Sequence, residues 1–279
     1  MDSITTEPLI LGGGFAGLSC AVELAAAGRK PVVLEKKPRL GGRAFSFTDP
    51  ESGDVIDNGQ HLFMGCYRET RRFLEKIGTS HLLHFPKQIR VDYADSTGAG
   101  DSLSCPSFLP APLHLSFGVL GMSGLSIADK TGLWRLAQAL RKIAKQGVGP
   151  ELDRLTVRQW LDSLGQSRRI QERLFDPIAI GALNDDPTVA AATGMAQVLA
   201  EIFFKTVDDS RFGLSTVGLS ALYVDAAKSF IESRGGKVIS SSKAAAILER
   251  DGRVSGVRLE NGETLESSVV VSTLAPWEL

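Results

Sequence analysis

The sequence contains little cysteine, and the few cysteines present are not arranged to bind a metal or to form a disulfide framework. Its 279 residues include only Cys20, Cys66 and Cys105, and none of them lies in a CxxC pair. An odd number of widely separated thiols excludes a disulfide scaffold and a cysteine-based zinc site. We therefore expect a protein of a reducing compartment, for which the cytoplasm fits best.

An excess of charge of one sign is also missing. The 31 lysines and arginines are balanced by 32 aspartates and glutamates, which leaves a formal net charge of -1. Nucleic-acid-binding domains usually carry a clear positive excess, so the composition gives no electrostatic reason to expect such a partner. With 43% hydrophobic and 23% charged residues, the chain has the composition of a globular protein of one large domain or two interleaved domains.

Long apolar runs are absent as well. A membrane-spanning helix needs about 20 consecutive apolar residues. The stretch 103–127 comes closest, but Pro106, Pro110 and Pro112 interrupt it. Near the amino-terminal end, the glycines of 12–17 interrupt the first apolar stretch and no basic region precedes it, which argues against a secretory signal.

The first pattern that predicts chemistry is a glycine-rich turn between a predicted strand and a predicted helix. A short apolar run at 9–11 predicts a buried strand, the sequence GGGFAG follows at 12–17, and 18–27 has the period of a helix that Gly28 ends. Strand, glycine turn and helix in this order are the context that the dinucleotide-binding fingerprint requires. We therefore predict a nucleotide cofactor at this turn.

Each residue type in the turn has a physical role in binding a dinucleotide. Gly12 permits the tight turn, Gly14 lets the backbone approach a pyrophosphate, and Gly17 lets the helix pack closely on the strand. Phe15 and Ala16 stand where the helix begins, and the N–H groups of a helix N-terminus are free to bind an anion. We predict that all five residues contact the cofactor.

An acidic residue stands at the end of the second predicted strand, 32–34. Glu35 follows Gly12 at about the spacing of some 20 residues at which a carboxylate accepts hydrogen bonds from ribose hydroxyls. A carboxylate there repels the 2′-phosphate of NADP, so NADP is disfavoured although Lys36 and Lys37 follow. We include Lys36 with Glu35 among the predicted cofactor contacts.

A second glycine pair, Gly41-Gly42-Arg43, follows the acidic residue. The guanidinium of Arg43 can lie against the same pyrophosphate or against the ribityl chain of a flavin cofactor. The order of GxGxxG, acid and GGR resembles the flavin amine oxidase and carotenoid desaturase superfamily. The resemblance implies FAD as the cofactor, with Gly42 and Arg43 in contact with it. It also implies an α/β fold, a discontinuous Rossmann-like FAD domain of the GR2 type with an inserted helix-rich substrate domain.

The run DNGQHLFMGCYRET at 57–70 narrows the resemblance. It is similar to the corresponding run of squalene-associated FAD-dependent desaturases, the hydroxysqualene dehydroxylases of bacterial hopanoid and squalene synthesis. This resemblance implies reductive removal of a hydroxyl from hydroxysqualene to give squalene. It places Gly59 and Gln60 beside the flavin ring and the backbone of Ala244 at the adenine. It also makes His61 the candidate proton donor to the departing hydroxyl.

Three alternatives stay open. Carotenoid desaturation of the phytoene type is the first. Flavin amine oxidation ranks lower, because no aromatic cage is recognisable and Trp134, Trp160 and Trp277 stand in places that packing explains. A non-catalytic or NAD-using nucleotide-binding module would share 12–17 but would have no use for the GGR pattern.

The middle of the chain changes to mostly helical patterns. A hairpin is expected at 89–104 with its turn at 95–101, and 133–145 predicts an amphipathic helix with a basic face. The nearly uncharged 108–127 is either core or a lipid-facing entrance. Together with the basic helix, it makes 103–145 a candidate for peripheral contact with a membrane. The implied partner is a polyisoprenoid substrate.

These patterns predict two domains formed by three segments. Residues 1–95 and 216–279 form the first and second parts of the FAD domain, and 96–215 form the substrate domain. Within the last segment, Asp-Gly and Asn-Gly turns predict a three-stranded meander, and 268–272 predicts a buried parallel strand. Relatives of the superfamily continue further and carry a second flavin-binding segment near their C-terminus, so we expect this chain to be a fragment.

Overall fold

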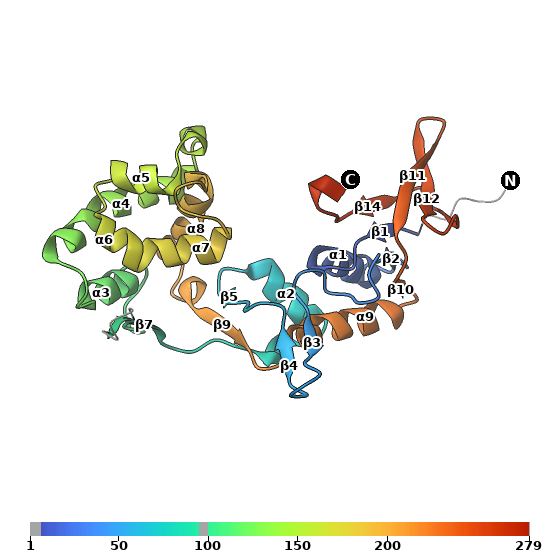
Figure 1. Ribbon diagram of the computed structural model, residues 1–279, viewed down its shortest axis with the longest axis horizontal. Coiled ribbons are helices and arrows are strands. Elements are labelled where there is room, and N and C mark those ends of the chain that lie inside the picture. Colours follow the sequence, from blue (N-terminus) through green and yellow to red (C-terminus); the bar gives the residue numbers. More distant parts are fainter. Residues whose placement is uncertain (1–6, 95–99, 279) are drawn as a thin grey trace. The chain divides into compact units, whose positions relative to one another are not determined.

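The structure, a computed structural model, describes residues 7–94 and 100–278 and divides into two compact units (Figure 1). Unit 1 consists of the described residues of Met1–Leu62, Arg68–His84 and Leu214–Leu279, and unit 2 of those of Phe63–Tyr67 and Phe85–Gly213. Each unit has its own core and its own type of architecture.

A parallel four-stranded sheet with strand order β10-β2-β1-β14 is the centre of unit 1. Its strands are β1 (Leu9–Leu11), β2 (Val32–Leu34), β10 (Lys237–Ile239) and β14 (Val270–Ser272). Leu9 pairs with Val32 on one side and with Val270 on the other, so distant parts of the sequence share one sheet. Parallel strands covered on both faces are apolar throughout, and Leu9, Ile10 and Leu11 are all buried. The predicted α/β fold with a parallel sheet is confirmed.

Helices cover this sheet. Helices α1 (Phe15–Ala26) and α9 (Asp225–Glu232) pack against each other and against strands of the sheet, and α2 (Arg68–Lys76) packs against α1. A π-helical turn at Ser220–Val224 leads directly into α9. Helix α1 ends as the sequence predicts, because Gly28 adopts the left-handed conformation with φ of 78°.

The other strands of unit 1 form small antiparallel sheets. The predicted meander consists of β11 (Ala244–Arg250), β12 (Arg253–Leu259) and β13 (Thr264–Glu266). Asp251 and Gly252 in its first turn have φ of 54° and 73°, which Asp-Gly turns favour. Strand β3 (Ser46–Thr48) pairs with β4 (Val55–Asp57), and β6 (Leu83–His84) pairs with the Leu214–Ser215 end of β9 (Phe212–Ser215). Short 3-10 turns lie at Ser80–Leu82 and Pro276–Glu278.

Unit 2 is mostly helical. Its helices are α3 (Leu113–Gly121), α4 (Ile127–Gln146), α5 (Val157–Ser163), α6 (Arg168–Ile170), α7 (Asp176–Leu183) and α8 (Ala192–Phe204), with a π-helical turn at Gln171–Phe175 and 3-10 turns at Pro150–Arg154 and Asp208–Ser210. Strand β5 (Phe63–Met64) pairs with the Phe212–Gly213 end of β9, and β7 (Ile89–Ala94) pairs with β8 (Gly100–Cys105). The predicted hairpin is thus present, while 95–99 of its turn lie outside the described residues. Its first strand belongs to unit 2, although the sequence predicts that the insertion begins only at residue 96.

The basic amphipathic helix predicted at 133–145 is the second half of α4. The helix begins earlier because Ser126 and Asp129 form a capping box, in which the Ser126 side chain accepts from the Asp129 N–H and Asp129 accepts from the Ser126 N–H. Leu136 and Leu140 on its inner face are buried in the main core of unit 2. Helix α5 also begins with a capping box, in which the Thr156 side chain accepts from the Gln159 N–H and the Gln159 side chain accepts from the Thr156 N–H.

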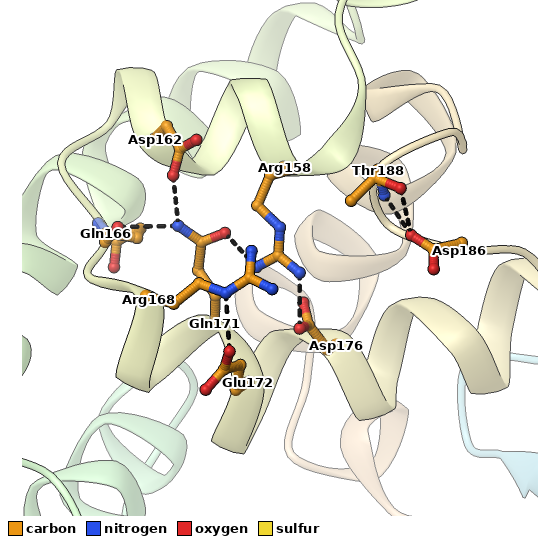
Figure 2. Close-up of polar contacts among 9 residues, drawn as sticks. All are labelled: Arg158, Asp162, Gln166, Arg168, Gln171, Glu172, Asp176, Asp186 and Thr188. Carbon is orange, nitrogen blue, oxygen red and sulfur yellow. Dashed lines mark hydrogen bonds and ion pairs between the residues drawn. The ribbon is translucent and has the colours of Figure 1, made fainter.

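A polar network joins α5 to the following helices of unit 2 (Figure 2). The guanidinium of Arg158 donates to Gln171 Oε1 over 2.7 Å and to Asp176 Oδ2 over 2.8 Å. The amide of Gln171 in turn donates to Asp162 Oδ1 over 2.7 Å. Because Arg158 and Asp176 keep only 13% and 15% of their side-chain surface exposed, each needs the other as a partner.

The apolar segment 108–127 is partly core and partly surface. Leu115 and Val119 on α3 are buried, while Leu113, Phe117 and Leu120 on its other face are 46%, 54% and 51% exposed. No helix within 7–94 and 100–278 is long and apolar enough to cross a membrane.

Packing accounts for one of the three tryptophans. Trp160 is 4% exposed, but Trp134 and Trp277 are 69% and 81% exposed. The expectation that packing explains all three is therefore wrong for Trp134 and Trp277, whose indoles lie on the surface of their units.

Candidate cofactor-binding site

The two glycine segments predicted to bind the cofactor lie against each other in unit 1. The N–H of Gly41 donates to the carbonyl of Gly13 over 2.9 Å, and Gly14 and Gly41 form an isolated parallel β-bridge. A Cβ built on Gly42 would lie 3.1 Å from the Cα of Gly14. The two loops approach this closely because neither carries a side chain at the contact.

The first loop leaves the start of α1 open to an anion. The helix begins at Phe15 with Gly14 as its N-cap, and no side chain caps its first turn. Ala16 and Gly17 belong to the same turn, in which the backbone N–H groups have no acceptor within the helix. Such groups, together with the positive end of the helix dipole, bind phosphates in proteins.

The glycines of this loop differ in what surrounds them. Gly12 has a φ of 105°, which favours glycine, and a Cβ on Gly17 would lie 1.9 Å from the Gly12 carbonyl oxygen. Gly17 therefore serves the close contact between helix and strand. A Cβ on Gly14 would meet no atom nearer than the Gly42 Cα at 3.7 Å. The space at Gly14 is open within the protein, as a position that faces a ligand requires.

Glu35 lies at the carboxyl end of β2 and reaches the first glycine loop. Its side chain is buried, its Oε2 accepts from the Gly13 N–H over 2.8 Å, and its Oε1 accepts from the Lys37 N–H over 2.8 Å. Each carboxylate oxygen retains a further lone pair, so both can still accept from ribose hydroxyls. The acid that the sequence assigns to the ribose is thus fixed in orientation beside the loop.

Two cationic residues predicted to contact the cofactor lie at the surface of unit 1. The ammonium of Lys36 forms an ion pair with Glu278 over 2.7 Å, so it has a protein partner close to Glu35. The Arg43 side chain is exposed, and its backbone carbonyl accepts from Asn58 Nδ2 over 2.9 Å. Both stay predictions as cofactor contacts.

The loop after β4 is joined to the second glycine segment. Besides the bond to the Arg43 carbonyl, the Asn58 N–H donates to the carbonyl of Phe45 over 2.8 Å. Gly59 follows with φ of 84°, a conformation that favours glycine, and Gln60 and His61 are exposed. The structure therefore places the predicted flavin-ring loop next to the loop that carries Arg43.

Ala244 begins β11 and packs partly buried in a small core with Leu9 and Leu34. Just before it, the Ser242 N–H donates to the backbone carbonyl of Glu35 over 2.8 Å. The segment predicted to meet the adenine therefore lies beside the residue predicted to bind the ribose, as one dinucleotide requires.

Two residues that contact the glycine loops were not predicted. Tyr223 donates its hydroxyl to the carbonyls of Gly41 and Ala44 over 2.9 and 2.5 Å. Thr273, just after β14, donates its hydroxyl to the carbonyl of Leu11 over 2.8 Å. In the sequence, Tyr223 is only one member of an apolar helical face, and Thr273 follows a buried strand without any motif. No local pattern could have revealed them.

The two histidines with the most contrasting surroundings are His61 and His114. His114, on α3 of unit 2, is completely buried, and its Nε2 lies 2.7 Å from the hydroxyl of Ser210. Burial lowers the pKa of its imidazole, which favours the neutral ring of a structural histidine. His61 is exposed in unit 1 and free to meet a ligand.

The hydrogen-bonding groups of this site in unit 1 fit the adenosine diphosphate part of FAD. An uncapped helix start and backbone N–H groups suit a pyrophosphate, and a buried, oriented carboxylate suits a ribose. The space beside Gly14 also borders the second glycine segment, because Gly42 is the nearest residue to a Cβ built on Gly14. The residues present therefore support the prediction of a dinucleotide cofactor.

Comparison with known families gives a match over nearly the whole chain. The profile of the family described as flavin-containing amine oxidoreductases matches residues 15–279. Among curated proteins, 15-cis-phytoene desaturase of Arabidopsis thaliana is 26% identical over 276 residues, which cover 94% of this chain and 46% of the relative. Zeta-carotene desaturase of Solanum lycopersicum is 29% identical over 237 residues, which cover 82% of this chain and 40% of the relative. The chain spans about half the length of such relatives or less.

Solved structures share the fold. An oxidoreductase from Methanosarcina mazei has a TM-score of 0.71 at 18% identity, and the match covers 97% of this chain and 59% of that one. Putrescine oxidase bound to putrescine has a TM-score of 0.69 at 18% identity, with 97% and 58% covered.

Proposed function

Because the chain belongs to the family of flavin-containing amine oxidoreductases, we propose that the full-length protein is an FAD-dependent oxidoreductase that acts on a polyisoprenoid. The family match supports FAD as the cofactor, in agreement with the glycine motifs. Since the chain spans 46% and 40% of two of its carotenoid desaturase relatives, the activity proposed is that of the whole protein.

One observation carries the cofactor assignment: the two glycine loops touch each other beside a buried carboxylate. The Gly41–Gly13 hydrogen bond and the Glu35–Gly13 hydrogen bond meet at one residue of the first loop. A pyrophosphate at the start of α1 would therefore face both loops at once. The proposed FAD contacts are Gly12, Gly14, Phe15, Ala16, Gly17, Glu35, Lys36, Gly42, Arg43, Gly59, Gln60 and Ala244.

The reaction we propose is the reductive dehydroxylation of hydroxysqualene to squalene. Bound and reduced FAD would supply a hydride. The carbon–oxygen bond would break, the hydroxyl would leave as water with a proton from an acid of the protein, and the hydride would take its place on carbon. An external two-electron donor would have to reduce the flavin again. The support is the resemblance of 57–70 to the dehydroxylases, together with the isoprenoid substrates that the names of the desaturase relatives indicate.

His61 is the residue that we propose to donate the proton. A hydroxyl leaves far more easily as water than as hydroxide, so a positioned acid accelerates the step. His61 is exposed, and it follows Gly59 in the loop that is hydrogen-bonded to the Arg43 segment.

We further propose that 103–145 touches the membrane in which the polyisoprenoid is dissolved. Leu113, Phe117 and Leu120 expose an apolar face on α3, and Trp134 is exposed on α4 among basic residues. Aromatic and apolar side chains next to cations favour an anionic lipid interface. A cytoplasmic protein that binds the inner membrane face at this segment would suit a water-insoluble substrate.

The deciding experiment supplies full-length protein with hydroxysqualene or phytoene and identifies the products by mass. Under a flavin reductant, we expect loss of one oxygen from hydroxysqualene, and His61→Gln should slow that step by about a hundredfold or more. His84→Gln, which changes another exposed histidine of unit 1, is the matched control. Phytoene desaturation without squalene formation would overturn the dehydroxylase assignment.

Carotenoid desaturation is the second candidate, and the names of the curated relatives favour it. In that reaction the substrate would lose a hydride to oxidised FAD and a proton to a base, a carbon–carbon double bond would form, and an external electron acceptor would have to reoxidise the flavin. Product analysis with phytoene and an electron acceptor decides between the two. Amine oxidation ranks third, and tight binding of NAD without flavin would indicate a nucleotide-binding module instead.

A further inference from the structure

Tyr223 is a completely buried tyrosine in the π-helical turn Ser220–Val224 of unit 1. A buried phenol is stable only where its hydroxyl finds a hydrogen-bond partner. No motif of the cofactor fingerprint includes this residue. π-helical turns within helices are frequent at functional sites, so the contacts of this side chain are informative.

The hydroxyl of Tyr223 binds the backbone of the second glycine loop. It lies 2.9 Å from the Gly41 carbonyl oxygen and 2.5 Å from the Ala44 carbonyl oxygen. Its single hydrogen is shared between these acceptors, which are the two ends of the turn 41–44. Burial raises the pKa of Tyr223 well above the ordinary value of a phenol, so the hydroxyl stays protonated and remains a donor.

The turn that Tyr223 holds needs such support. Gly41 and Gly42 have φ of 97° and 62°, and ordering two successive glycines in the left-handed region costs more backbone entropy than ordering other residues. Within the turn, the Ala44 N–H donates to the Gly41 carbonyl over 3.1 Å. The Tyr223 hydroxyl adds a bond to the same carbonyl from outside the turn.

The ring of Tyr223 contacts the first glycine loop. Its centroid lies 4.7 Å from that of Phe15, the first residue of α1, and 6.3 Å from that of Phe73 on α2. Phe15 and Phe73 also pack edge to face at 5.2 Å. The three rings form a small aromatic cluster that fixes the start of α1.

Neighbouring residues attach the same segment to the far end of the loop. The Ser46 N–H donates to Ser220 Oγ over 2.9 Å, and the Ser220 N–H donates to Ser46 Oγ over 3.0 Å. Asp57 Oδ1 accepts from the Leu219 N–H over 2.9 Å and from the Ser46 hydroxyl over 2.6 Å. The segment 219–224 therefore forms hydrogen bonds with the loop 41–46 at both of its ends.

We propose that Tyr223 is a positioning residue for the cofactor, whose hydroxyl fixes the Gly41–Ala44 turn and whose ring fixes Phe15. A single side chain thus contacts both loops that face the pyrophosphate, in addition to the direct hydrogen bond between Gly41 and Gly13. This inference rests on the proposed binding of FAD, since the loops are taken to be its cradle. A role in packing alone would need the ring but not the hydroxyl.

The test is Tyr223→Phe in the full-length protein, because phenylalanine keeps the ring and removes only the hydroxyl. We expect the dissociation constant for FAD, measured by flavin fluorescence, to rise about tenfold. Amide hydrogen exchange of peptides that cover 41–46 should accelerate in the flavin-free protein, while exchange of the β1 peptide stays unchanged. Tyr93→Phe, which removes a partly buried tyrosine hydroxyl in unit 2, is the control and should change neither measurement.

The outcomes separate the inference from the function on which it rests. Unchanged FAD affinity together with unchanged exchange at 41–46 would overturn the positioning role. A uniform increase of exchange across unit 1 with unchanged affinity would do the same, since it indicates packing alone. Wild-type protein that binds no FAD would overturn the proposed function, and faster exchange confined to 41–46 would then still show that the hydroxyl holds the turn.

Discussion

The key contacts of the two units involve different groups, mainly backbone groups in unit 1 and side chains in unit 2. In unit 1 the candidate site is mainly backbone: the N–H of Gly13 binds Glu35, the N–H of Gly41 binds the Gly13 carbonyl, and α1 starts without a side-chain cap. In unit 2 the comparable contacts are between side chains, such as Arg158 with Asp176. A site made of backbone constrains the sequence to glycine at particular positions, whereas side-chain packing constrains only size and polarity.

That difference explains where the sequence is informative. Glycine substitutions cannot be compensated by a neighbour, because a Cβ at Gly17 would lie 1.9 Å from a backbone oxygen. A buried residue such as Trp160 lies in a core of many apolar side chains. Changes in the size of its neighbours could compensate for a change in its own size. The sequence of unit 1 therefore carries the glycine motifs that predict a cofactor, whereas the patterns of unit 2 predict mainly secondary structure.

The largest effects are expected from substitutions of two glycines in the same loop, one of which should prevent folding while the other should prevent only FAD binding. Gly17→Val should prevent folding of unit 1, because the new side chain meets the Gly12 carbonyl, and the loss should show as insoluble protein or absent near-ultraviolet circular dichroism. Gly14→Val should leave the fold intact, since the nearest atom to its Cβ lies at 3.7 Å, but should abolish FAD binding by filling the space of the pyrophosphate. If Gly14→Val retains FAD at the wild-type affinity, the loop is not the phosphate cradle.

The next effect should lie in unit 2 and concern stability alone. Trp160 is 4% exposed in the main core of that unit, so Trp160→Ala should lower the free energy of unfolding by about 3–5 kcal/mol. The affinity of the folded protein for FAD should not change. Trp134→Ala is the matched control, because that indole is 69% exposed and its removal leaves no cavity. A weaker FAD affinity in Trp160→Ala would contradict the assignment of cofactor binding to unit 1.

A smaller effect is expected at the acid beside the glycine loop. Glu35→Ala removes the acceptor of the Gly13 and Lys37 N–H groups and of the proposed ribose hydroxyls. FAD affinity should fall by about ten- to a hundredfold. Titration by flavin fluorescence measures this change. Glu23→Ala, which removes an acid of α1 that pairs with Lys76, should leave the affinity unchanged.

The smallest effect should come from an exposed ion pair of unit 1. Lys243 and Glu260 lie 2.8 Å apart, with 54% and 64% of their side chains exposed. Exposed pairs of this kind contribute little to stability, so Lys243→Ala should leave the thermal midpoint and FAD binding unchanged within error. A clear loss of FAD affinity would instead indicate that the conformation at the start of β11, where Ala244 lies, depends on this cation.

Much of unit 1 was predictable because its signals are local. The strand at 9–11, the helix that Gly28 ends and the Asp-Gly turn at 251–252 each follow from neighbours in sequence, and the structure confirms them. The start of α4 was missed, since the capping box at Ser126 precedes the region of clear periodicity. The exposure of Trp134 was also missed, because a helical pattern does not say which apolar residue remains uncovered.

The sequence by itself indicated the fold class and the two glycine motifs, because positive φ at Gly12, Gly41 and Gly42 and close packing at Gly17 favour glycine at these positions. Only the tertiary structure decided that the motifs touch, that Glu35 orients toward Gly13, and that a tyrosine from a distant helix holds the second loop. Gly41 and Tyr223 are 182 positions apart, and a hydrogen bond between them leaves no periodic signal along the chain. Such contacts arise because the fold packs Tyr223 against Phe15 at the start of α1 and against the turn 41–44, which no local pattern encodes.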